Sequence, residues 1–210
     1  MSANCCHHCE PEDGGPAYRR ALWAVLAINA AMFAVEIGAG LMSGSASLQA
    51  DALDFLGDAA NYGISLFVVG MALRYRAMAA VAKGATMAVF GLWVLGVTGW
   101  HLWHQTLPQA MTMGAVGLTA LAANGASFAI LWRYRSGDAN MRSAWICTRN
   151  DVLGNIAVLA AAAGVFGTGT GWPDAVVAAI MAALALQGAW IVLRQARGEL
   201  RLSPAPVAAE

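Results

Sequence analysis

Two pairs of potential metal ligands stand out because they occur within long apolar stretches. Asp54 and Asp58 are four residues apart, and Cys147 and Asp151 share that spacing. In a helix, residues four apart project from the same face, so each pair can offer two ligands to one ion. Three carboxylates and one thiolate suit tetrahedral zinc, and the sulfur favours soft cations such as zinc or cadmium over magnesium or calcium. We therefore predict a metal site made of these four residues.

The same residues also allow other interpretations. Asp51 lies close enough to the start of its apolar run to cap a helix. Buried acids can relay protons without binding a metal, and an intramembrane cysteine is often only a small apolar side chain. However, an ionisable side chain at the centre of a membrane helix costs about 2.5–3.5 kcal/mol on insertion scales. We therefore favour a metal or proton pathway for Asp54, Asp58 and Asp151 over a purely structural role.

Glu36 and Arg149 are the other charged residues within apolar runs. Arg149 is two residues from both Cys147 and Asp151, so it projects from the opposite side of its helix. We expect it to form a structural ion pair, and the sequence leaves both Glu36 and Asp51 open as partners.

The elements that must position these residues are membrane-spanning helices. Hydrophobic residues make up 59% of the chain and charged residues 11%, and the mean hydropathy is +0.58. A spanning helix needs roughly 20 mostly apolar residues, and lipid leaves no partner for unpaired backbone groups, which favours helices over strands. Glycines within the runs are expected to allow close helix contacts, at Gly38, Gly40, Gly63, Gly70, Gly154 and Gly164. The sequence predicts an all-α membrane protein with six transmembrane helices, near residues 21–42, 47–72, 80–103, 109–132, 143–166 and 174–194.

Basic residues predict the orientation of these helices. Apart from Arg149, every Lys and Arg lies before the first run, after the last, or in the second and fourth connections, where we place Lys83 as well. Positively charged segments stay in the cytoplasm, so we predict a multi-pass protein of the inner or plasma membrane with both termini cytoplasmic. The formal net charge is zero, which does not suggest a nucleic-acid partner.

The first residues of the chain form a second candidate metal site. Cysteines and histidines are crowded into five positions there, followed by acidic residues; they are Cys5, Cys6, His7, His8 and Cys9. Thiols and imidazoles are ligands for zinc or copper, although a flexible tail could also bind metal incidentally. We predict a Cys/His-rich cytoplasmic tail at residues 1–19, a six-helix domain at 20–195 and a short cytoplasmic tail at 196–210.

At several positions the sequence resembles the cation diffusion facilitator family. The stretch from Asn29 to Asp58 resembles that family's first two helices, with Glu36, Gly40, Ser43-Gly44-Ser45 and Asp51 preceding Asp54-x-x-x-Asp58. Ser143-Ala144-Trp145, followed by Cys147-x-x-x-Asp151 and Gly154, resembles the fifth helix, and Trp172-Pro173-Asp174 resembles the start of the sixth.

This resemblance implies a function and a ligand set. It implies efflux of zinc, and by extension cadmium or cobalt, from the cytoplasm in exchange for protons, usually by a homodimer. By the same resemblance, Asp54 and Asp58 occupy the ligand positions of the second helix, and Cys147 and Asp151 those of the fifth, where the family commonly has His in place of Cys147. The cytosolic domain that usually follows the sixth helix is not expected here, because only a short Pro- and Ala-rich segment remains.

Two other functions fit part of the sequence. One is a proton-coupled metal uptake transporter with the same ligands, because a sequence does not give the direction of flux. The other is a membrane-anchored metal sensor or carrier that uses the N-terminal cluster; buried acids argue against it, since an anchor needs none. No HExxH or GxSxG motif is present, so we do not expect an enzyme.

Overall fold

Six α-helices make up the protein in the computed structural model, which describes residues 16–67, 73–133 and 139–202. For some of these residues, including 139–150, only the backbone is described. The helices are α1 (Pro16–Ser43), α2 (Ala46–Phe67), α3 (Leu73–His104), α4 (Ala110–Trp132), α5 (Ala139–Thr168) and α6 (Trp172–Leu202). The prediction of an all-helical fold with six helices is confirmed.

Within the described residues, five stretches are long and apolar enough to cross a membrane, and each lies in a different helix. They are Pro16–Ser43, Ala77–His104, Ala110–Trp132, Asp151–Thr168 and Trp172–Arg201. The remaining helix, α2, carries Asp51, Asp54 and Asp58, which lower its hydropathy. Most of the first half of α2 is buried against other helices, so these carboxylates face protein rather than lipid.

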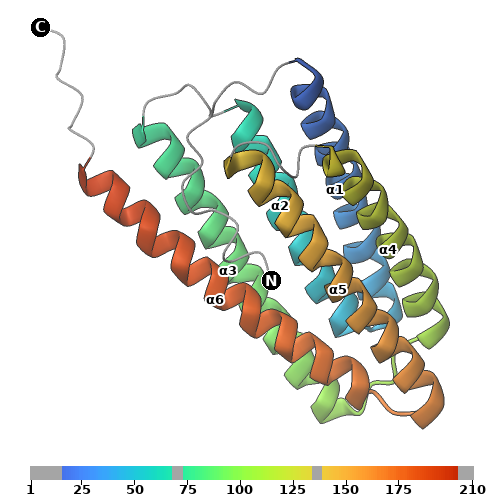
Figure 1. Cartoon of the computed structure of the whole chain (residues 1–210). Helices are drawn as coiled ribbons and strands as arrows, with labels where there is room; N and C mark the ends of the chain where they lie inside the picture. Colours follow the sequence, from blue (N-terminus) through green and yellow to red (C-terminus); the bar gives the residue numbers. More distant parts are fainter. Residues whose placement is uncertain (1–15, 68–72, 134–138, 203–210) are drawn as a thin grey trace, which may run out of the picture.

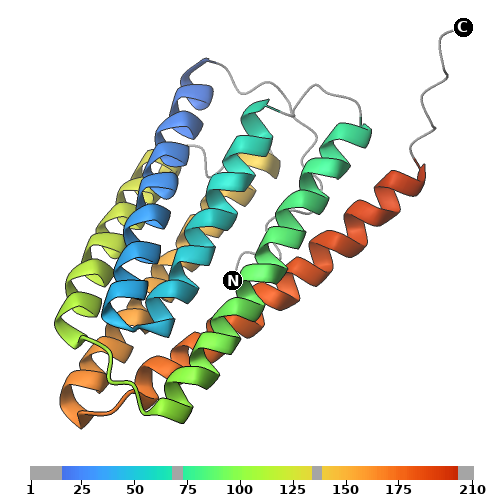
Figure 2. The same cartoon turned by 180° about the vertical axis from the view of Figure 1, so that it is seen from behind.

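The helices form two groups that run the length of the molecule. Helices α1, α2, α4 and α5 pack together, and α3 and α6 lie side by side as a pair (Figure 1). We call the end with the α1–α2, α3–α4 and α5–α6 connections the hairpin end, and the end where α1 begins and α6 ends the terminal end. The α3/α6 pair meets the other helices near the hairpin end and leans away from them toward the terminal end (Figures 1 and 2).

Small residues bring α3 and α6 close together. A Cβ added at Gly84 would lie 2.9 Å from a side-chain carbon of Leu193, and one at Gly91 would lie 3.0 Å from Leu186. Leucine side chains of α6 therefore occupy the space above these two glycines. Such contacts make the pair a tightly packed unit.

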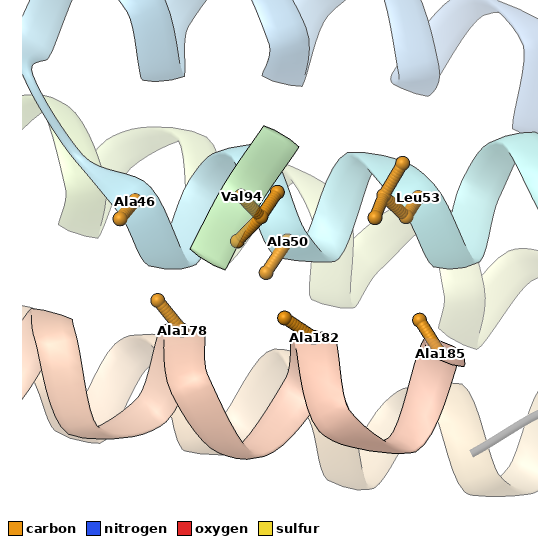
Figure 3. Packing of buried hydrophobic residues seen from close by; sticks show 7 residues of the cluster. All are labelled: Ala46, Ala50, Leu53, Val94, Ala178, Ala182 and Ala185. Carbon is orange, nitrogen blue, oxygen red and sulfur yellow. The ribbon is translucent and has the colours of Figure 1, made fainter. Parts of the chain in front are cut away.

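The pair contacts α2 through a layer dominated by alanines. The side chains of α6 point toward those of α2, with Val94 of α3 beside them (Figure 3). This cluster consists of Ala46, Ala50, Leu53, Val94, Ala178, Ala182 and Ala185. Alanine has no side-chain rotamers to interlock, so this interface is smoother than the leucine-filled contact between α3 and α6.

Several of the sequence expectations need correction. Lys83 does not lie in a connection: it is on α3, which begins at Leu73, and it is buried and donates a hydrogen bond to Asn61 Oδ1. A Cβ at Gly38 or Gly63 would meet nothing within 4 Å, so these glycines do not mark close helix contacts. The expectation holds for Gly40 and Gly164. A Cβ at Gly154 would make only ordinary van der Waals contacts at 3.7 Å, and Gly70 lies outside the described residues.

Candidate metal site

Asp58 of α2 and Asp151 of α5 meet in the middle of the bundle. Both are buried, with 2% and 4% of their surface exposed, and their side chains interact directly. Tyr62 OH donates to Oδ2 of Asp58 at 3.3 Å. Among the described residues, no hydrogen-bond donor reaches Oδ1 of Asp58 or either oxygen of Asp151. Two carboxylates in contact repel each other unless a cation or a proton lies between them.

Asp54, one turn before Asp58, lies against the same part of α5. Its Oδ2 atom is 3.7 Å from the position that a Cβ would take on Gly154, and Oδ1 of Asp51 is equally far from that point. Asp54 also interacts electrostatically with both Asp58 and Asp151. The structure thus places Asp54, Asp58 and Asp151 in the same region of the α2–α5 contact.

A chain of buried polar side chains adjoins this site, and the sequence pattern alone does not predict it. Asn124 of α4 donates from Nδ2 to Oδ1 of Asn155 at 2.8 Å, and Asn155 donates from Nδ2 to Oδ2 of Asp51 at 2.7 Å. Asp51 in turn interacts with Glu36 of α1, whose two oxygens have no donor among the described residues. All four residues are at most 2% exposed. Asn124 and Asn155 carry no formal charge, so they do not stand out among the ionisable residues of the apolar runs.

The side chains of the other predicted metal ligands are not among those that the structure describes. The backbone of Cys147 belongs to α5, four residues before Asp151, but its side chain is not described, and the same holds for Arg149. The cluster Cys5, Cys6, His7, His8 and Cys9 lies in the undescribed segment 1–15. Among the side chains that are described, no three of the His, Cys, Asp and Glu residues are arranged as ligands of one ion. Binding through Asp54, Asp58 and Asp151 would therefore require side-chain movement.

This arrangement can bind a cation or a proton. The site offers carboxylates from two helices, and no described donor satisfies those of Asp151. Anionic ligands surrounded by apolar helices favour a small, multiply charged ion that neutralises them. Such a site inside a bundle of apolar helices is typical of a membrane transport protein.

Comparison with known proteins agrees with this class. Residues 22–200 match the family model described as the cation efflux transmembrane domain, so the chain belongs to that family. It is 26% identical over 199 residues to the metal cation efflux system protein CzcD of Cupriavidus metallidurans, which covers 89% of this chain and 62% of CzcD. It is 28% identical over 207 residues to the zinc transporter ZitB of Pectobacterium atrosepticum, covering 92% of this chain and 64% of that protein.

A second zinc transporter ZitB, from Escherichia coli, is 28% identical over 213 residues, covering 94% of this chain and 66% of the relative. The chain thus spans a little under two thirds of the length of these relatives. The family is one of transporters and not of enzymes, and the predicted resemblance to cation diffusion facilitators is confirmed.

Proposed function

We propose that this protein exports a divalent cation from the cytoplasm in exchange for protons. Zinc is the foremost candidate because two of the similar proteins are named zinc transporters, and cadmium and cobalt suit the same ligands. One observation carries the proposal: Asp58 and Asp151, from two helices, are in contact while buried and short of donors. We propose that Asp54, Asp58, Cys147 and Asp151 bind the transported ion.

The arrangement of basic residues supports a cytoplasmic location for both termini. Arginines lie in the first turns of α1 and α3, next to the end of α4 and along the last turns of α6, all of which belong to the terminal end. The connections at the hairpin end carry no Lys or Arg. The positive-inside rule then places the terminal end in the cytoplasm, and metal would enter from that side.

The two groups of helices suggest how access could alternate. The α3/α6 pair is held together by side chains packed over Gly84 and Gly91. Its apolar contact with α2 is dominated by alanines, and at the hairpin end Asp174 of α6 ties it to the start of α2 by hydrogen bonds. The pair also leans away from the other helices toward the terminal end (Figures 1 and 2). We propose that the pair moves as a unit over the alanine layer, exposing the carboxylates first to one side of the membrane and then to the other.

Proton coupling would follow from the chemistry of the ligands. A carboxylate or thiol must lose its proton to bind a metal ion, so binding releases protons. Because a proton and a cation compete for the same oxygens of Asp58 and Asp151, protons arriving from outside would displace the metal. No separate proton pathway is needed for this exchange.

Flux measurements in proteoliposomes test the proposal. Zinc and cadmium movement would be followed under an imposed pH gradient for the wild type, for Asp58→Asn, and for Ser127→Ala as a control that removes a buried polar atom of α4. We expect gradient-dependent flux in the wild type and the control, and none in Asp58→Asn. Absence of flux in the wild type, with insertion verified, would instead favour a metal sensor or carrier.

The N-terminal cluster would serve as a capture site at the cytoplasmic mouth. Deleting residues 1–15 is expected to raise the zinc concentration at half-maximal flux, because fewer ions would be held near the entrance, without changing the maximal rate. An unchanged half-saturating concentration would show that the tail is not involved.

We also propose that the protein forms a homodimer, as the family resemblance implies. The mass of the protein in mild detergent would test this.

A further inference from the structure

The buried chain of amides next to the metal site has a defined direction. Nδ2 of Asn124 donates to the side-chain oxygen Oδ1 of Asn155. The side-chain nitrogen Nδ2 of Asn155 is therefore the atom that faces Asp51. If Asn155 were rotated by half a turn, two acceptors would face each other at Asp51 and two donors at Asn124. The ionised carboxylate of Asp51 can only accept, so Asn155 presents its nitrogen to Asp51 and its oxygen to the donating nitrogen of Asn124.

The carboxylate held by this chain lies beside a proposed ligand. Oδ1 of Asp51 and Oδ2 of Asp54 both lie 3.7 Å from the Cβ position of Gly154, and the two residues interact electrostatically. Asp51 thus lies close to the cation site, although its Oδ2 is bound to Asn155 at 2.7 Å.

The alternatives open to Asp51 are few. The other carboxylate with which it interacts is Glu36, which is fully buried and whose oxygens have no described donor. An Asp51 released from Asn155 would be attracted by any cation bound near Asp54.

We propose that Asn124 and Asn155 are specificity-determining residues that keep Asp51 out of the coordination sphere of the transported ion. With Asp51 held back, the site has four ligands, one of them sulfur, which suits zinc. A released Asp51 would add a carboxylate, and a larger number of oxygen ligands suits harder ions such as manganese or calcium. This inference rests on the proposed metal site and concerns its selectivity.

Binding and flux of Zn²⁺ and Mn²⁺, measured in parallel on the full chain, test this inference. Binding would be measured by equilibrium dialysis in detergent and flux in proteoliposomes, for the wild type, Asn155→Leu, Asn124→Asp and Ser127→Ala. Asn155→Leu removes the donor to Asp51. Asn124→Asp removes the donor to Asn155, so that Asn155 turns its nitrogen toward the new carboxylate and no longer donates to Asp51. Ser127→Ala is one turn further along α4, equally buried, and outside the amide chain.

We expect the ratio of Mn²⁺ to Zn²⁺, in binding and in flux, to rise on the order of tenfold in both Asn variants, which is the effect of losing one charge-assisted hydrogen bond. It should stay unchanged in Ser127→Ala. Adding Asp51→Asn to Asn155→Leu should return the ratio to the wild-type value, because the released carboxylate is gone.

An equal fall for both ions would mean that the asparagines only support the fold, and an unchanged ratio would mean that Asp51 is not restrained by them; either result overturns the inference. If Asn155→Leu does not insert, Asn124→Asp decides by the same criteria. A wild type that binds no zinc would contradict the proposed metal site itself.

Discussion

Buried carboxylates occur in two regions of this protein, and their surroundings are opposite. At the hairpin end, Asp174 of α6 is 2% exposed and accepts three hydrogen bonds, from Ser45 Oγ at 2.7 Å, Ala46 N at 2.8 Å and Ser47 N at 3.0 Å. In the middle of the bundle, Asp58 and Asp151 are similarly buried, but among the described residues Asp58 has one donor and Asp151 none.

This difference separates a structural carboxylate from one that is available to a ligand. Asp174 caps the first backbone N–H groups of α2, which have no partner within their own helix, and it ties α2 to α6. Asp58 and Asp151 stabilise nothing in this way, and their contact is repulsive when both are ionised. These carboxylates are similarly buried, so it is the number of hydrogen-bond donors around each one that distinguishes Asp174 from the proposed ligands Asp58 and Asp151.

The largest expected effect is on transport. Asp58→Ala or Asp151→Ala should abolish zinc flux while leaving insertion intact. The unfolding temperature in detergent should stay close to that of the wild type, because neither residue caps a helix as Asp174 does. Thermal unfolding and vesicle flux, measured on the same preparations, would check stability and transport together. If a variant lost flux because it unfolded, Asp58 and Asp151 would be structural residues like Asp174.

Asp174→Ala should have the opposite profile. It would leave the backbone N–H groups of Ala46 and Ser47 buried without their acceptor, which costs roughly 2–5 kcal/mol of unfolding free energy. Asp174→Asn, which keeps the shape but presents a donor to one N–H group, should lie between Asp174→Ala and the wild type. Thermal unfolding in detergent would measure this series. An Asp174→Ala variant as stable as the wild type would show that the cap is not structural.

Glycine substitutions should distinguish the same two regions at a smaller scale. A Cβ on Gly171, at the hairpin end, would lie 2.5 Å from the carbonyl oxygen of Thr106, whereas one on Gly154, beside the carboxylates, meets nothing nearer than 3.7 Å. Gly171→Ala should cost about 1–3 kcal/mol, and Gly154→Ala should be neutral or stabilising because alanine favours the helix. Gly167→Ala, with open space around it, is the control for thermal unfolding.

The smallest expected effect is on ion preference. Cys147→His should retain zinc transport, because imidazole is a good zinc ligand, and should weaken cadmium transport, because a soft sulfur is lost. Competition between the two ions in vesicles would measure this. An unchanged preference for cadmium would exclude the thiolate of Cys147 as a ligand.

The sequence predicted those parts of the fold and site that follow from composition and periodicity. The six apolar runs correspond to six helices. Asp54 and Asp58 are four residues apart, so they lie on the same face of α2, which faces the part of α5 that carries Asp151. Lys83 was misplaced because a lysine near the end of an apolar run looks like the end of that run. In the structure, its partner Asn61 lies on another helix.

Contacts between distant residues could not be predicted in this way. Asp174 was recognised only as part of the start of α6, but it bonds residues 127 to 129 positions earlier in the chain. Asn155 and Asn124 are single polar residues in apolar helices, and their partners depend on how α2, α4 and α5 pack. A local pattern gives the face of a helix on which a residue lies, but not which helix that face meets.

Equilibrium zinc binding to the purified protein tests most directly the claim that the unsatisfied carboxylates bind the ion. It would be measured for the wild type, Asp58→Ala, Asp151→Ala and Asp174→Asn, each checked for folding. We predict that Asp58→Ala and Asp151→Ala each bind one zinc ion fewer than the wild type, and that Asp174→Asn binds as many as the wild type. Equal zinc binding by the wild type, Asp58→Ala and Asp151→Ala would contradict the account, because the ion would then be held elsewhere in the chain.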